Sequence, residues 1–191
     1  MRRCGWCGED ALYVAYHDAE WGVPVRDDGE LFERLMLEGM QAGLSWYTIL
    51  VKRAHMRRAF FGFDPEALVS RGPGALASWL ADPGLIRHRG KLEALIGNAA
   101  VTLALDEPLS HFLWRFVGGQ PQQNRWRRSS QVPSATETST AMSKALKQHG
   151  FRFVGPTTCY AFMQSVGMVN DHMLDCHRHA VCADLAAAWR P

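Results

Sequence analysis

The pattern of apolar and polar residues predicts two consecutive helices between residues 27 and 58. Asp27 or Asp28 can cap the first helix and Ser45 the second, because short polar side chains accept hydrogen bonds from the free N–H groups of a helix start. Gly43 is the expected break between the two helices. Their apolar faces are expected to consist of Leu31, Phe32, Leu35 and Met36 in the first helix, and of Trp46, Ile49, Leu50 and Ala54 in the second.

Further helices are predicted along most of the remaining chain. Asp64-Pro65 favours a helix that ends near residue 72, where Pro73 and Gly74 predict a break before a second short helix. Thr138 or Ser139 is the expected cap of a later helix, and residues 151–154 are expected to be extended. The other predicted helical segments cover residues 10–17, 75–81, 91–105, 108–117 and 157–166, and the apolar face of the segment 91–105 includes Leu103. Strand signals are nearly absent, which predicts an all-α fold in which residues 119–138 form the one long irregular stretch.

Length, composition and charge limit the possible function classes. A chain of 191 residues can form one sizeable core, and 47% hydrophobic with 21% charged residues is typical of a globular protein. A net charge of +2 is too small to indicate a polyanionic partner on its own. No apolar run is long enough to span a membrane, and the start of the chain lacks the apolar core of a signal peptide, so we expect a cytoplasmic protein without a membrane partner.

Cysteine and histidine residues at the two ends of the chain suggest a metal site. Five cysteines in a reducing compartment favour metal ligands or buried thiols over disulfides. His172 and Cys176 are four residues apart, which on a helix places both on one face, and Cys4 and His17 supply a second pair. Two sulfur and two nitrogen ligands suit a tetrahedral, structural zinc ion. Buried cysteines with surface histidines remain the alternative, and other donors that could compete are Cys7, His177, His179 and Cys182.

The turn between residues 84 and 91 has the features of a DNA-backbone contact. Gly84 and Gly90 allow close approach of the main chain to a phosphate, and Arg87, Arg89 and Lys91 add positive charge. A basic, solvated loop between two helices is the alternative. A second basic segment, Arg125-Trp126-Arg127-Arg128, could follow a phosphate backbone, but a structural role as a loop cover is favoured there.

Seven ordered sequence blocks resemble the DNA-3-methyladenine glycosylase I family, from the N-terminus to about Cys176. The residues after Cys176 depart from that family's pattern. The blocks are Cys4-Gly5-Trp6, residues 13–18, residues 20–24, residues 37–46, residues 86–91, residues 143–151 and Val169-Asn170-Asp171-His172. The resemblance implies a single glycosylase unit over residues 1–191, all-α, with the helix-hairpin-helix glycosylase fold. Two helical lobes would share a base pocket, and a structural zinc would join the N- and C-terminal segments.

The same resemblance implies the role of individual residues. It assigns Cys4, His17, His172 and Cys176 as ligands of one zinc ion, and it places Glu38, Tyr16 and Trp46 around the excised base. Tyr13 and Trp21 would line the pocket, and Gly43 and Leu44 would lie at the gap that the base leaves. For Glu38 and Trp46 taken alone, a surface carboxylate and a core indole remain the simpler interpretation.

The implied activity is excision of 3-methyladenine from double-stranded DNA by a monomeric enzyme. The enzyme would evert the base, hydrolyse its N-glycosidic bond, and leave free 3-methyladenine and an abasic site. Alkylation at N3 makes the base a cation and a good leaving group, so Glu38 can serve in binding as well as in catalysis. Two alternatives are a non-catalytic helix-hairpin-helix module that binds damaged DNA, and a zinc hydrolase, which would need an open metal position.

Overall fold

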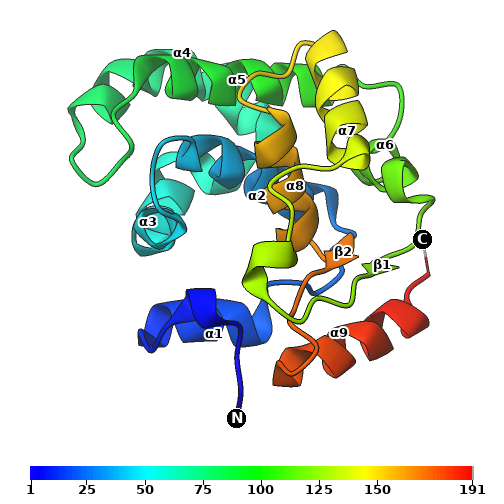
Figure 1. Ribbon diagram of the computed structural model, residues 1–191. Helices are drawn as coiled ribbons and strands as arrows, with labels where there is room; N and C mark the ends of the chain where they lie inside the picture. Colours follow the sequence, from blue (N-terminus) through cyan, green and yellow to red (C-terminus); the bar gives the residue numbers. More distant parts are fainter. Residues whose placement is uncertain (191) are drawn as a thin grey trace.

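The computed structural model describes residues 1–190, and its regular secondary structure over that range is almost entirely helical (Figure 1). The α-helices are α1 (Ala11–Ala19), α2 (Asp28–Gln41), α3 (Trp46–Ala59), α4 (Pro65–Ala81), α5 (Arg89–Leu103), α6 (Leu109–Trp114), α7 (Glu137–Gln148), α8 (Pro156–Ser165) and α9 (His177–Ala188). Two short strands, β1 (Gln122–Gln123) and β2 (Val169–Asn170), form a parallel pair in which Gln122 lies opposite Val169. The predicted all-α class is confirmed, and no helix within residues 1–190 is both long and apolar enough to cross a membrane.

The boundaries of α2 and α3 follow the predicted caps. The Asp27 carboxylate accepts a hydrogen bond from the Glu30 N–H at 2.8 Å, and the Ser45 hydroxyl accepts one from the Thr48 N–H at 3.2 Å. Gly43 has a φ of +79° in the turn between the helices, a conformation that side chains disfavour. The apolar face of α2 is buried as predicted. On α3, however, Ala54 is exposed and Met56 is buried in its place, so that part of the prediction was wrong.

Helix α4 is continuous, which corrects the predicted break at Pro73. Proline in a helix interior removes one hydrogen bond and costs about 3 kcal/mol. The helix continues because it lies along α5: a side chain at Gly72 would come within 2.9 Å of Ile96 Cγ1. Such a close approach of two helices contributes packing energy that offsets the proline, and sequence spacing alone does not show it.

Three local predictions also need correction. The cap of α7 is Thr136, whose hydroxyl accepts from the Ser139 N–H at 3.1 Å while the Ser139 hydroxyl accepts from the Thr136 N–H. Residues 151–154 are not a regular extended run, because Phe153 adopts a φ of +58°. Leu103, predicted to face inward, is half exposed at the end of α5.

Two hydrophobic clusters of different size organise the molecule. The large cluster draws its residues from α2 to α8 and includes Phe32, Leu92 and Phe162. The small cluster consists of Cys4, Tyr16, Trp21, Leu50 and Cys176. In Figure 1, α1 and α9 lie at one end of the molecule and α4 and α5 at the other. The N-terminal segment therefore packs mainly against its own small cluster.

Candidate active site and metal centre

A cavity of about 270 Å³ lies between the N-terminal segment and helices α2, α3 and α8. All five residues predicted to surround a base line it, namely Tyr13, Tyr16, Trp21, Glu38 and Trp46. Residues that sequence reasoning did not single out complete the lining: Trp6, Gln41, Ser129, Val132, Ala161, Gln164, Asp171 and Met173. The structure thus gathers the predicted residues from three separate segments around one space.

Aromatic rings form most of the cavity wall. The centroids of Trp6 and Trp21 are 4.9 Å apart with an edge-to-face geometry, and those of Tyr16 and Trp46 are 5.4 Å apart. Such pairs hold one another in fixed orientations. Trp46 Nε1 is buried without a hydrogen-bond partner among residues 1–190. A buried N–H group without a partner is unfavourable, so this indole carries an energetic cost that hydrophobic packing alone does not explain.

Glu38 is a buried acid in the fourth turn of α2. Its side chain is 4% exposed, and burial raises the pKa of the carboxyl to about 8, while the Arg34 guanidinium and the Ser165 hydroxyl oppose that shift. Glu38 is therefore largely protonated at neutral pH when the cavity is empty. A cation that enters the cavity would favour the ionised form, because an opposite charge nearby stabilises a carboxylate. The simpler interpretation of Glu38 as a surface residue is wrong.

Asp171 is a second buried acid in the cavity wall, and its surroundings differ from those of Glu38. Its oxygens accept hydrogen bonds from Asn124 Nδ2 and Trp126 Nε1 on one side and from the Tyr160 hydroxyl and Gln164 Nε2 on the other, at 2.6–2.8 Å. The indole of Trp126 therefore binds another part of the protein through its N–H group. This agrees with the prediction that Trp126 covers a loop. Periodicity does not reveal this arrangement, because its donors come from two separate segments, the loop after β1 and helix α8.

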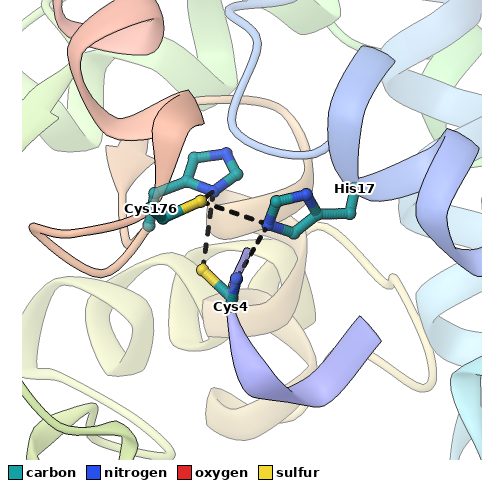
Figure 2. A group of neighbouring side chains, drawn as sticks. Cys4, His17 and Cys176 are labelled. Atoms are coloured by element: carbon teal, nitrogen blue, oxygen red, sulfur yellow. Dashed lines mark hydrogen bonds between the residues drawn. The ribbon is translucent and has the colours of Figure 1, made fainter. Parts of the chain in front are cut away.

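Cys4, His17, His172 and Cys176 form a buried group that can hold a metal ion. Their ligand atoms all lie within 4.8 Å of one another. Cys176 Sγ lies 3.5 Å from His17 Nε2 and 3.5 Å from His172 Nδ1, and Cys4 Sγ lies 3.6 Å from His172 Nδ1. Figure 2 shows the side chains of Cys4, His17 and Cys176 pointing toward a common centre. The structure thus brings both ends of the chain together at the predicted residues.

The second nitrogen of each histidine in this group has a fixed partner. His17 Nδ1 lies 2.7 Å from Asp18 Oδ1, and Asp18 in turn accepts hydrogen bonds from the Arg3 guanidinium. His172 Nε2 lies 3.0 Å from the Trp21 carbonyl oxygen. These contacts orient the two rings so that Nε2 of His17 and Nδ1 of His172 face the common centre, as second-layer partners do in metal sites.

The donors named as competitors are engaged elsewhere. His177 contacts the Arg2 carbonyl and Asp18, and His179 contacts the Asn124 carbonyl oxygen at 2.9 Å. Cys7 lies against the Gly8 carbonyl, and Cys182 against the Arg178 guanidinium. None of these four residues belongs to the group that can hold a metal.

The predicted pair His172 and Cys176 comes together for a different reason from the one expected. The two residues lie in a turn before α9 and not on a helix. The turn is closed by a hydrogen bond from the Cys176 N–H to the Met173 carbonyl oxygen at 2.8 Å. The Met173 N–H also donates to Cys4 Sγ at 3.4 Å, so the backbone of the turn contacts the N-terminal segment directly.

Residues 84–91, predicted to contact the DNA backbone, form the turn between α4 and α5 and the start of α5. We call them the basic hairpin. Arg87 and Arg89 are exposed, and Arg89 Nη1 lies 3.5 Å from Glu93. Gly84 has no room for a side chain, because a Cβ atom there would lie 2.7 Å from the His55 ring. The turn is also held by hydrogen bonds from the Gly84 N–H to Asp82 Oδ1 and from Lys52 Nζ to the Pro83 carbonyl oxygen. The hairpin is therefore fixed against α3.

Lys91 does not extend from the hairpin as predicted. Its side chain is buried, and Nζ donates to the carbonyl oxygens of Met40 at 2.9 Å and Ala42 at 2.6 Å. These are carbonyls at the carboxyl end of α2, which a positive charge stabilises. Lys91 thus joins the start of α5 to the turn that contains Gly43 and Leu44, and its ammonium does not face solvent. Leu44 itself is 40% exposed in that turn.

An aromatic cavity with a buried acid, in a chain that also has an exposed basic hairpin, fits the class of proteins that act on a base removed from the DNA stack. Comparison with known proteins supports this class. The family model described as methyladenine glycosylase matches residues 6–179. The chain belongs to the methyladenine glycosylase family, which confirms the predicted relationship.

Individual relatives match almost the whole chain. DNA-3-methyladenine glycosylase 1 of Escherichia coli strain K12 is 50% identical over 179 residues, which is 92% of this chain and 96% of the relative. A crystal structure of 3-methyladenine DNA glycosylase I has a TM-score of 0.91 and 48% identity, and the match covers 93% of this chain and all of the other. A Staphylococcus aureus structure that describes 3-methyladenine recognition by its glycosylase has a TM-score of 0.89 and 36% identity, covering 94% and 97% of the two chains.

Proposed function

We propose that this protein removes 3-methyladenine from alkylated double-stranded DNA. The observation that carries the proposal is the cavity of about 270 Å³ in which five aromatic rings surround the buried carboxyl of Glu38. A cavity of this size is slightly below the range for drug-sized ligands and suits a single base. The relatives named as 3-methyladenine glycosylases give the substrate class.

The cavity favours a base that carries positive charge. The faces of Tyr16 and Trp46 offer a stacking surface, and cation–π attraction strengthens stacking for a cationic ring over a neutral one. Glu38 can accept a hydrogen bond from the exocyclic amine of the base. The positive charge on the alkylated base would favour the ionised, carboxylate form of Glu38. Glu38 would then release its proton on binding, so the affinity for the cationic base should rise with pH up to about 8.

The reaction requires little assistance from an acid or a base. Water adds to C1′ of the sugar, the bond from C1′ to the base nitrogen breaks, and the electron pair of that bond neutralises the positive charge of the base. The products are free 3-methyladenine, an abasic site and a proton. Extrusion, stacking and exclusion of water from the cavity supply the acceleration, and Glu38 contributes mainly by binding the base.

We propose that Cys4, His17, His172 and Cys176 hold one structural zinc ion. Zn–S bonds of about 2.3 Å and Zn–N bonds of about 2.0–2.1 Å at tetrahedral angles place neighbouring sulfur and nitrogen ligands roughly 3.6 Å apart. The three such distances quoted above are 3.5, 3.5 and 3.6 Å. Four protein ligands leave no position for a catalytic water, which argues against a zinc hydrolase.

The remaining predicted residues would contact DNA. Arg87, Arg89 and the backbone at Gly90 would hold phosphates, whereas the Gly84 N–H already donates to Asp82 and Gly84 would shape the turn. Gly43 with Leu44 would enter the gap left by the base. Lys91 would act by fixing that turn rather than by touching a phosphate. The chain would work as a monomer and as one unit, with two lobes meeting at the cavity. Its free, buried thiols favour the reducing cytoplasm as its compartment.

Release of free base from methylated DNA, resolved by chromatography, tests the proposed function. The expected product is 3-methyladenine, with no base released from undamaged DNA of the same sequence. Tight binding to methylated DNA without release of any base would instead favour a non-catalytic damage-binding module.

A further inference from the structure

The orientation of the Gln164 amide is fixed by Asp171. A carboxylate accepts hydrogen bonds and donates none, so the amide end that faces Asp171 Oδ2 at 2.8 Å must be the NH₂ group. Trp126 Nε1 and Asn124 Nδ2 occupy Oδ1, and the Tyr160 hydroxyl shares Oδ2. Asp171 therefore receives four donors. If the Gln164 amide were reversed, its carbonyl oxygen would face the carboxylate and be repelled.

The other end of the same amide is an unused acceptor. Gln164 lines the aromatic cavity, and its Oε1 accepts no hydrogen bond from any residue between 1 and 190. Its backbone is also anchored, because the Gly22 N–H donates to the Gln164 carbonyl oxygen at 3.1 Å. The residue follows Ala161, another part of the cavity wall, by one turn of α8. The cavity therefore contains an acceptor whose direction is set by its neighbours.

We propose that Gln164 Oε1 reads the exocyclic amine of the everted base and that Asp171 is the positioning residue that holds it as an acceptor. The inference deepens the proposed function and rests on it. An adenine-type base presents an amine at C6, whereas a hypoxanthine- or guanine-type base presents an oxygen there. An oxygen would face Gln164 Oε1 with no hydrogen between them. Rotating the amide to accommodate that oxygen would place Oε1 against the Asp171 carboxylate.

The pair thus gives selectivity that aromatic stacking alone does not provide. Stacking tolerates any purine, because every base has a π-face. A site built to pair with a polar group discriminates strongly when that group is replaced, because its own polar atoms are left without partners. Glu38, which can accept or donate according to its protonation, does not distinguish an amine from an oxygen in this way.

The test compares two free bases that differ at C6, 3-methyladenine and 3-methylhypoxanthine, by calorimetric titration of the zinc-loaded protein. Gln164→Leu should weaken binding of 3-methyladenine about tenfold, as expected when a buried donor loses its partner. Binding of 3-methylhypoxanthine should stay the same or improve, so the selectivity ratio should fall at least tenfold. The control Gln123→Leu removes a glutamine that contacts Asn170 from outside the cavity, and it should leave both affinities unchanged.

Asp171→Asn provides the second variant. The new amide can donate to Gln164 Oε1, which frees Gln164 to turn its NH₂ group toward the cavity, so selectivity should fall further than in Gln164→Leu or reverse. If Gln164→Leu left the ratio of the two affinities unchanged, because both affinities fell by the same factor or neither fell, the inference would be overturned. If Asp171→Asn does not fold, Gln164→Leu still decides. Wild-type protein that failed to bind 3-methyladenine would instead contradict the proposed function.

Discussion

The two ends of the molecule are stabilised in different ways. At the α4–α5 end, buried apolar side chains such as Leu68, Trp79 and Leu92 belong to one large core. At the α1 end, the small cluster of Cys4, Tyr16, Trp21, Leu50 and Cys176 offers far less apolar area, and the four Cys and His side chains lie among its residues. A segment with so little core gains from a cross-link, and a metal ion held by the group that includes residues 4 and 176 would provide one.

The cavity lies where these two regions meet. Trp6, Tyr13 and Trp21 come from the N-terminal segment, whereas Glu38 and Trp46 come from helices that pack in the large core. One wall therefore depends on the metal group and the other on hydrophobic packing. Changes at the two regions should affect base binding through different physical causes, and four predictions separate them.

The largest effect is expected from loss of the metal. Cys4→Ser or His172→Ala should lower the free energy of unfolding by about 4 kcal/mol when the free zinc concentration is about a thousand times the dissociation constant of the site. The reason is that zinc binds only the folded protein and thereby stabilises the folded state. Thermal melts with elemental analysis check this, and limited proteolysis should release the N-terminal segment. His177→Ala is the matched control, since His177 lies beside the group without belonging to it. Metal-free protein with full stability would contradict the assignment.

The next effect concerns the pH dependence of stability at Glu38. Its folded-state pKa of about 8 lies above the ordinary value of 4.5, so the folded protein retains a proton that the unfolded chain loses. The free energy of unfolding should therefore fall as pH rises from about 4.5 to 8. At about 1.4 kcal/mol per pH unit, the loss should reach roughly 3 kcal/mol at pH 7. Glu38→Gln should lack this component, as urea unfolding at several pH values would show. Parallel pH profiles for both proteins would argue against a buried, protonated Glu38.

Trp46→Ala should weaken binding of free 3-methyladenine by roughly 1–3 kcal/mol, the range for stacking of a base on an aromatic ring. Titration of the folded variant measures this directly. Trp79→Ala is the control from the large core: it should lower the melting temperature while the folded fraction binds the base normally. If the two variants lost affinity only in proportion to their unfolded fractions, Trp46 would be a core residue and not part of the binding site.

The smallest effect distinguishes the two basic residues at the hairpin. Arg89→Ala should remove one phosphate contact. The slope of the logarithm of DNA affinity against the logarithm of salt concentration should then decrease in magnitude by about one. Lys91→Met should leave that slope unchanged, because its ammonium binds the carbonyl oxygens of Met40 and Ala42. Measurements of affinity at several salt concentrations would separate these roles. A reduced slope in Lys91→Met would restore Lys91 as a phosphate contact.

Local signals predicted much of the fold. Asp27 and Ser45 were correct caps because a cap depends on a few neighbouring residues. The break at Pro73 was wrong because packing along α5 outweighs the local cost of proline. The four residues that can hold a metal were identifiable from residue type, although the turn before α9 replaces the expected helix. Gln164 and Asp171 could not be predicted: they are close in sequence, but Asn124 and Trp126, which also fix Asp171, are more than 40 residues away along the chain.

Hydrogen exchange on metal-loaded and metal-stripped protein, with 3-methyladenine titrated into both, shows whether the metal orders the N-terminal wall of the cavity. We expect metal removal to expose the amides of α1 while those of α4 and α5 remain protected, and we expect affinity for the base to fall together with α1 protection. Unchanged protection of α1 after complete removal of the metal, with base affinity retained, would show that packing alone orders the N-terminal wall and would contradict the account.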